Sequence, residues 1–126
     1  MENKILVIIP ARGGSKGVPR KNIKLLNNVP LINYTIETAR KIFSDTIICV
    51  STDDDEIIKV VKKSGLEVPF KRPVSISTDN SSSYEFLQHA LDFYYKEKNY
   101  SPDILILLQP TSPFRTANQI LEAMKL

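Results

Sequence analysis

The sequence predicts an α/β domain of three layers, in which helices cover both faces of a mainly parallel sheet. Three apolar runs have the length of strands and do not alternate with polar residues, as expected where both faces of a strand are buried. They occupy residues 5–9, 46–50 and 104–108. Segments with helical periodicity separate these runs, and this order is typical of parallel strands joined by right-handed crossovers.

The first two helices have recognisable ends. Pro30 suits the first helical position, and apolar residues recur at helical spacing from there to Phe43. Thr52 or Asp53 is expected to cap the second helix, and Gly65 is expected to end it. Both segments are therefore predicted to be crossover helices.

Two further helices are expected downstream. Ser82, with Glu85 three residues later, predicts the start of the third helix, and Thr116 with Gln119 predicts the start of a fourth. The fourth pattern reaches Leu126 without a stop signal or a following strand, so we expect a truncated domain. Residues 1–126 are therefore expected to belong to a single domain.

The composition excludes several classes of protein. The chain has 126 residues, of which 42% are hydrophobic and 25% charged, and its net charge of +3 is too small to indicate nucleic-acid binding. No apolar run approaches the roughly 20 residues that span a bilayer, and no signal peptide is recognised, so a cytoplasmic protein without a membrane anchor is expected. Cys49 is the only cysteine, which excludes a disulfide framework.

The segment after the first predicted strand carries the chemistry. Residues 10–24 hold five cations, three glycines and no acidic residue. Glycines allow backbone amides to approach an anion closely, cations supply the balancing charge, and ligands of open α/β sheets bind beyond the carboxyl ends of strands. The spacing matches neither the P-loop nor the dinucleotide fingerprint. A solvated basic loop is the alternative, but the position favours a triphosphate site.

Three segments in order then resemble one family. Residues 9–17 with Pro19, Lys21, Asn22 and Ile23 resemble the signature of the CMP-N-acylneuraminate synthetases, and residues 50–57 and 107–115 agree with it. The resemblance covers essentially the whole chain and about the first half of a typical member. It implies a nucleotide-diphospho-sugar-transferase-like, Rossmann-like fold. It also implies that residues 1–126 are the nucleotide-binding portion of a single cytidylyltransferase domain whose carboxyl-terminal half is absent.

The resemblance also implies a role for individual residues. Lys21 and Arg12 would be the catalytic cations that hold the triphosphate of CTP, and Gln109 would lie in the substrate pocket. The nucleotide-binding set would comprise Arg12, Gly13, Gly14, Ser15, Lys16, Lys21, Asn22, Arg72, Ser81 and Ser83. For the serines, a polar loop that caps the third helix is an equally good interpretation.

No metal ligand is predicted in this chain. The acidic residues 53–56 are explained by helix capping and the helix dipole, and the magnesium-binding aspartates of the family would lie beyond Leu126. His89 has no paired ligand and is interpreted as a structural or surface histidine. Mg²⁺ is therefore the expected cofactor, with its ligands outside residues 1–126.

The resemblance implies a cytidylyltransferase that transfers CMP from CTP to a sialic-acid-type nonulosonic acid and releases pyrophosphate. Its partners would be these two substrates and, in the full-length protein, a second copy of the chain. Three alternatives stay open: a relative that uses an eight-carbon keto sugar, a non-catalytic nucleotide-binding fragment, and a basic loop that binds nucleic acid.

Overall fold

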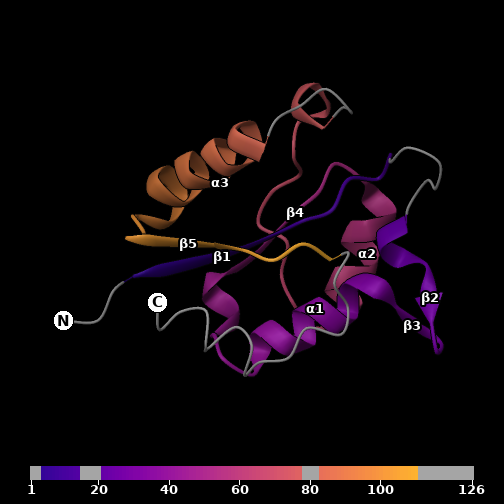
Figure 1. Cartoon of the computed structure of the whole chain (residues 1–126). Helices are drawn as coiled ribbons and strands as arrows, with labels where there is room; N and C mark the ends of the chain where they lie inside the picture. The colour runs from indigo at the N-terminus through magenta and orange to yellow at the C-terminus, as the bar shows by residue number, and fades with distance from the viewer. Residues whose placement is uncertain (1–3, 15–20, 78–82, 111–126) are drawn as a thin grey trace.

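A computed structural model of the chain describes residues 4–14, 21–77 and 83–110 (Figure 1). Its main sheet contains β1 (Ile5–Pro10), β4 (Ile48–Ser51) and β5 (Ile104–Leu107), in the order β4-β1-β5. Both pairs of neighbouring strands are parallel, and β1 is central. The predicted parallel sheet is confirmed. The predicted fourth helix and its Thr116 cap lie outside the described residues.

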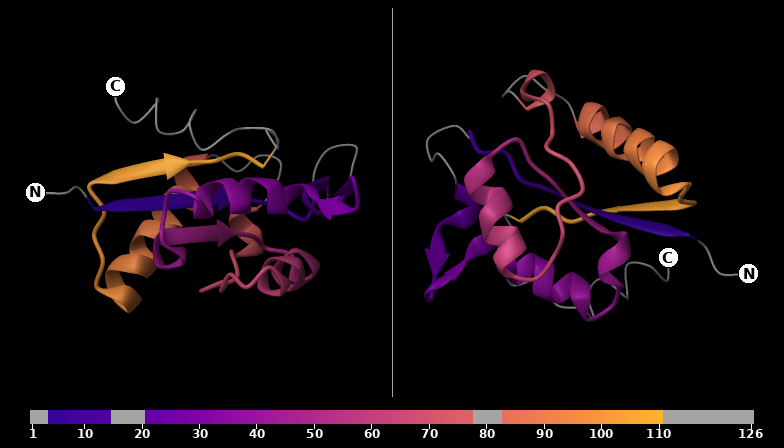
Figure 2. Two further views of the ribbon diagram at one scale, coloured as in Figure 1. Left: turned by 90° about the horizontal axis from the view of Figure 1, so that it is seen from below. Right: turned by 180° about the vertical axis from the view of Figure 1, so that it is seen from behind.

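Helices cover the two faces of this sheet. Figure 1 shows α3 (Ser83–Lys98) above the strands and α1 (Leu31–Arg40) below them, and Figure 2 shows the same layers from two other directions. α2 (Asp55–Lys63) packs on the same side as α1, because both helices contribute to one buried cluster. The predicted three-layer α/β fold is therefore confirmed.

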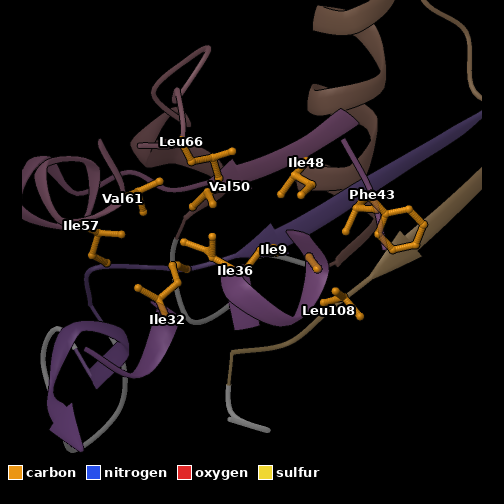
Figure 3. Close-up of a cluster of buried hydrophobic side chains, with 13 residues drawn as sticks. Ile9, Ile32, Ile36, Phe43, Ile48, Val50, Ile57, Val61, Leu66 and Leu108 are labelled. Carbon is orange, nitrogen blue, oxygen red and sulfur yellow. The ribbon is translucent and has the colours of Figure 1, made fainter. Parts of the chain in front are cut away.

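The alternation of side chains along β1 divides the core into two clusters. Val7 and Ile9 point toward α1 and α2, whereas Leu6 and Ile8 point toward α3, and all four are fully buried. Figure 3 shows the larger cluster, in which side chains from β1, β4, α1 and α2 converge. The continuous apolar run in the sequence thus reflects burial on both faces of the strand.

Strand β5 is less well covered than the sequence predicts. Ile104, Leu105 and Leu107 are each 37% exposed, although their run is as apolar as that of β1. In the described part of the chain β5 pairs only with β1 and lies at the edge of the sheet. The expectation of burial on both faces therefore holds for β1 and β4 but only in part for β5.

The ends of α2 show which residue caps it. Asp54 is the N-cap, and its Oδ2 accepts a hydrogen bond of 3.1 Å from the amide of Ile57. The predicted cap, Thr52 or Asp53, is wrong by one or two residues, because Thr52 Oγ1 instead accepts from the amide of Asp54 at 3.2 Å. Gly65 ends the helix as predicted, with a φ of +94° that favours glycine.

The start of α1 differs from the prediction by one residue. Pro30 occupies the N-cap position and not the first helical position, because it ends β3 (Val29–Pro30), which pairs with β2 (Leu25–Leu26) in a short hairpin. Strand β4 also begins at Ile48, two residues later than predicted, since the segment Asp45–Ile47 forms a 3₁₀ turn.

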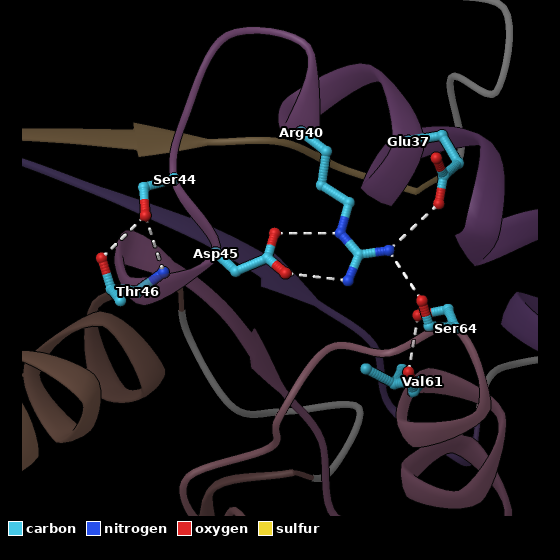
Figure 4. Close-up of polar contacts among 7 residues, drawn as sticks. All are labelled: Glu37, Arg40, Ser44, Asp45, Thr46, Val61 and Ser64. Carbon is cyan, nitrogen blue, oxygen red and sulfur yellow. Dashed lines mark hydrogen bonds and ion pairs between the residues drawn. The ribbon is translucent and has the colours of Figure 1, made fainter.

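A polar cluster joins the end of α1 to this turn and to the end of α2 (Figure 4). Arg40 donates from Nε and one Nη to the Asp45 carboxylate at 2.9 Å each, and its other Nη donates to the Ser64 carbonyl at 2.7 Å. These bonds raise the pKa of Arg40 and lower the pKa of Asp45. Because Asp45 is half exposed, we expect the pair to stabilise the fold by no more than about 1 kcal/mol.

Among the described helices, none is long and apolar enough to cross a bilayer.

Cys49 provides a test of the core. Its side chain is fully buried, and this burial raises the pKa of the thiol to about 12. At pH 8 the thiolate is then about 10³-fold rarer than in an ordinary cysteine, so Cys49 should react with a disulfide reagent only when the protein unfolds. The rate at which the reagent reacts with Cys49, measured in native buffer and in guanidinium chloride, checks this expectation. Rapid reaction in native buffer would contradict the described packing.

Candidate functional site

The carboxyl ends of β1 and β4 lie side by side and bring two loops together. Pro10 pairs with Ser51 at the last position of both strands, and the amide of Ala11 donates to the Ser51 carbonyl at 2.9 Å. The glycine-rich segment after β1 and the acidic segment after β4 therefore leave the sheet from adjacent positions. This is the edge at which open α/β sheets bind ligands.

Gly13 lies in direct contact with the loop after β4. Its amide donates a hydrogen bond of 2.9 Å to Oδ1 of Asp53, and the residue is buried. A Cβ added at this position would lie 2.6 Å from the Cβ of Asp54. Neither Gly13 nor Gly14 has a positive φ, so a left-handed backbone conformation is not the reason for glycine at either position. At position 13 the reason is close approach of two loops, because no side chain has room there.

Asn22 connects the end of the predicted phosphate loop to its start. The residue lies in a 3₁₀ turn, Lys21–Ile23, and its Nδ2 donates to the Arg12 carbonyl at 3.2 Å. Arg12 itself is half-buried. The two described ends of the loop are therefore held together, with Lys21 next to Asn22. Ser15 and Lys16 lie outside the described residues, as does the side chain of Lys21.

Arg72 is buried beneath the same loops. Its Nε donates to Ser51 Oγ at 2.9 Å, one Nη donates to the Ser51 carbonyl at 2.7 Å, and its guanidinium lies 4.8 Å from the ring centre of Phe86. Only 2% of the residue is exposed. The guanidinium thus joins β4 to α3, and the predicted contact between Arg72 and the nucleotide stays a prediction.

The charge of Asp53 acts on Arg72 against the repulsion from Arg12. Burial lowers the pKa of Arg72, the negative charge of Asp53 raises it, and the positive charge of Arg12 lowers it again. Both arginines therefore lie within electrostatic reach of one another, with the carboxylate of Asp53 as the opposite charge nearby. We refer to Asp53 and four of the predicted nucleotide-binding residues as one cluster. These four residues are Arg12, Gly13, Asn22 and Arg72.

Sequence reasoning did not assign Asp53 to the site, since it explained the acidic run by capping. The strand register would have found this residue. Pro10 and Ser51 are partners, so Gly13 and Asp53 follow three and two residues after paired positions. Two segments that leave adjacent parallel strands at matching points are expected to meet, but only once the pairing of the strands is known.

The remaining predicted residues are less closely associated with the cluster. Gln109 is exposed and follows β5, on the other side of β1 from β4. Ser81 lies outside the described residues, as does the side chain of Ser83. The ring of His89 packs edge-on against Phe70, with 4.7 Å between the two ring centres. Burial and the positive charge of Arg72 lower the pKa of His89, in keeping with a structural histidine.

Two other features bear on ligand binding. The described residues contain no group of three His, Cys, Asp or Glu side chains that could hold a metal ion. A cavity of about 330 Å³ lies at the opposite, amino-terminal end of β4, away from Arg12 and Gly13. Its walls combine Tyr and Lys side chains of α3 with the turn before β4, and they include Asp45, Thr46, Glu67, Tyr94, Lys98 and Tyr100.

Fold and site together define an α/β domain with a parallel sheet and a cationic, glycine-rich segment after its first strand. Residues 6–125 match the family model described as "Cytidylyltransferase". The chain is 41% identical over 126 residues to the N-acylneuraminate cytidylyltransferase of Escherichia coli O18:K1:H7, and it covers 29% of that protein. The chain therefore belongs to the cytidylyltransferase family, and its resemblance to the CMP-N-acylneuraminate synthetases is confirmed.

Other relatives extend this picture. The CMP-N,N'-diacetyllegionaminic acid synthase of Legionella pneumophila is 39% identical over 123 residues, or 98% of this chain and 53% of that protein. The solved structure of a CMP:2-keto-3-deoxy-manno-octonic acid synthetase complexed with CTP has a TM-score of 0.75 and 24% identity, over 97% of this chain and 47% of that one. The chain thus spans about half or less of the length of these proteins, and the last comparison shows the fold alone.

The contact at Gly13 predicts a difference between two neighbouring glycines. Gly13→Ala should destabilise the protein by about 1–3 kcal/mol, because its new methyl group would overlap with the Asp54 side chain. Gly14→Ala is the matched control, since a Cβ there meets nothing within 4 Å. Denaturant unfolding of both variants measures the effect. Equal stability of the two would show that the loops are not in contact.

Burial of Arg72 predicts a loss of stability that its neighbour does not share. Arg72→Ala removes both hydrogen bonds to Ser51 and the contact with Phe86, and we expect it to lower the free energy of unfolding by about 2–4 kcal/mol. Lys71→Ala is the control, because Lys71 is half exposed and pairs with the exposed Asp55, at 3.1 Å. Thermal and denaturant unfolding should separate them, and a stable Arg72→Ala variant would argue against a structural role.

Proposed function

We propose that this chain forms the nucleotide-binding part of an enzyme that transfers CMP from CTP to a nonulosonic acid and releases pyrophosphate. The observation that carries the proposal is the cluster at the ends of β1 and β4, where Arg12 and the Gly13 loop are held by Asp53 and Asn22. A cation and a glycine-rich segment whose backbone is held at Arg12 and Gly13 suit a triphosphate, because donors and charges that are oriented in advance need no reorganisation. Membership of the cytidylyltransferase family supports CTP as the nucleotide.

The chemistry proposed for these residues is positioning and charge neutralisation. The anomeric hydroxyl of the sugar attacks the α-phosphorus of CTP, the bond from the α-phosphorus to the bridging oxygen breaks, and pyrophosphate leaves with the bonding electron pair. Arg12 and Lys21 would balance the negative charge of the phosphates in the ground state and as it shifts toward pyrophosphate. Gln109, at the end of β5, offers an amide that could bind a sugar hydroxyl or a pyrimidine edge.

The described residues do not fit a magnesium site. Asp53 and Asp54 lie in the loop after β4, and each accepts a hydrogen bond from a backbone amide, of Gly13 and Ile57 respectively. Mg²⁺ stays part of the proposal only for the full-length protein, with ligands outside residues 1–126. A homodimer and a cytoplasmic location likewise belong to the proposal for that protein.

The names of the relatives support a nine-carbon keto acid as the sugar. The two curated relatives described above are named for N-acylneuraminate and for diacetyllegionaminic acid, both of which are nonulosonic acids. The structural relative named for an octonic acid keeps the eight-carbon substrate as the alternative within the same family. Its 24% identity supports the fold and not the choice of sugar.

Titration calorimetry distinguishes a CTP site from a general anion site. The chain should bind CTP more tightly than ATP, and a DNA oligonucleotide should bind weakly, with an affinity that falls steeply as salt increases. A non-catalytic nucleotide-binding module would share the CTP result but would give no CMP-sugar in the full-length protein. Equal affinity for all three ligands would refute the proposed nucleotide site.

Lys21 supplies the test of catalysis. In the full-length protein, Lys21→Ala should lower kcat/KM by about 10²–10³-fold, which corresponds to one lost interaction with the transferring phosphates. Lys24→Ala removes the same charge three residues later from an exposed position and serves as the control. Release of pyrophosphate is the measurement, and thermal unfolding shows that both variants fold. Turnover near the wild-type value in Lys21→Ala would contradict the assignment.

A further inference from the structure

We propose that Asp53 is a positioning residue that holds residues 11–14, the start of the loop after β1, and thereby places Arg12 for binding of a triphosphate. This inference rests on the proposed function, because the loop is taken as the site for CTP. Asp53 would not touch the nucleotide itself. Its carboxylate would act through the Gly13 amide, which it binds at 2.9 Å across a separation of 40 residues.

The backbone around Asp53 is fixed on both sides, which is what a positioning group requires. Thr52 precedes it at the end of β4 and is fully buried, and the Thr52 carbonyl accepts a hydrogen bond of 2.7 Å from the amide of Arg72. Asp54 follows it and starts α2 by binding the Ile57 amide. The carboxylate of Asp53 is therefore presented from a rigid turn between a strand and a helix.

Capping does not explain Asp53, because Asp54 already performs that role. The hydrogen bond that Asp53 accepts comes from a different loop, and it is charge-assisted and partly buried, which makes such bonds stronger than neutral ones. Gly13 has no side chain in the way of this bond, and the close approach of Asp54 leaves room for none. The hydrogen bond from Gly13 to Asp53 and the close packing of Gly13 against Asp54 both hold the start of the loop against the segment after β4.

Electrostatics gives the second reason for a carboxylate at this position. Arg12 and Arg72 are close enough for their positive charges to oppose one another, and Asp53 provides the opposite charge for Arg72. A carboxylate exposed to a triphosphate would repel it, whereas one that is bonded to the Gly13 amide and lies close to Arg72 can offset the repulsion between the arginines. The arrangement suits a group that organises the cations beside the ligand.

Two substitutions test this role in the chain, with a third as control. Asp53→Ala removes the acceptor, and Asp53→Asn keeps an acceptor oxygen of the same shape without the charge. Asp55→Asn makes the same chemical change two residues away, where the side chain is 76% exposed and pairs with Lys71. Hydrogen exchange of the Gly13 amide by NMR reads the contact directly, and calorimetry with CTP reads its consequence.

We expect Asp53→Ala to lose protection at Gly13 and to weaken CTP binding about 10–100-fold, as for loss of a hydrogen bond to a charged group. Asp53→Asn should recover part of both effects, and Asp55→Asn should match the wild type. Thermal unfolding separates positioning from stability, because a merely structural role would lower the melting temperature without changing the CTP affinity of the folded protein. Should Asp53→Ala not fold, Asp53→Asn carries the same comparison.

The results separate failure of this inference from failure of the proposed function. If the wild type binds CTP and both Asp53 variants bind it equally well, the positioning role is overturned. If the wild type does not bind CTP, the proposed function fails and the role of Asp53 toward CTP fails with it, whereas exchange at Gly13 still reports the contact. In a variant that already carries Arg12→Ala, Asp53→Ala should weaken CTP binding by a smaller factor than it does in the wild type. An equal factor in both would show that Asp53 does not act through Arg12.

Discussion

Parallel pairing of β1 with β4 is the constraint on which the site depends. The register places Pro10 beside Ser51, and from there two loops with opposite charge leave the sheet together. One loop brings glycines and cations, and the other brings carboxylates at the start of α2. Because both strands are buried on both faces, a shift of register by one residue would turn each side chain to the opposite face and disrupt the packing of both core clusters. The hydrogen bond from Gly13 to Asp53 follows from that fixed register.

The acidic and basic parts of the site have separate tasks. Asp54 caps α2, Asp53 holds the neighbouring loop, and Arg72 fastens β4 to α3 through Ser51 and Phe86. Each of these groups is at least partly removed from water, where an unpaired charge or amide would be unfavourable. The described contacts thus hold the backbone of Ala11, Arg12 and Gly13 at the start of the loop. Preorganisation of this kind is what binding of a phosphate chain requires.

The chain spans 29–53% of the lengths of the relatives compared with it. Among the described residues the sheet is unevenly buried, because β1 is enclosed whereas Leu105 and Leu107 of β5 are each 37% exposed. The cavity at the amino-terminal end of β4 lies away from the proposed nucleotide site and shares no residue with it. Nucleotide binding at the carboxyl ends of the strands is therefore the function that the described part of the chain supports best.

The sequence by itself determined the fold class and the place of the cationic, glycine-rich segment, because apolar runs and helical periodicity reflect burial and this segment directly follows the first buried strand. It also indicated that Gly65 ends α2. Only the tertiary structure decided what Asp53, Gly13 and Arg72 do. Their partners lie 40 and 21 residues away in the chain. The local sequence pattern predicts the secondary structure and the charge of a segment. A contact between two loops depends instead on the order and register in which the strands pair.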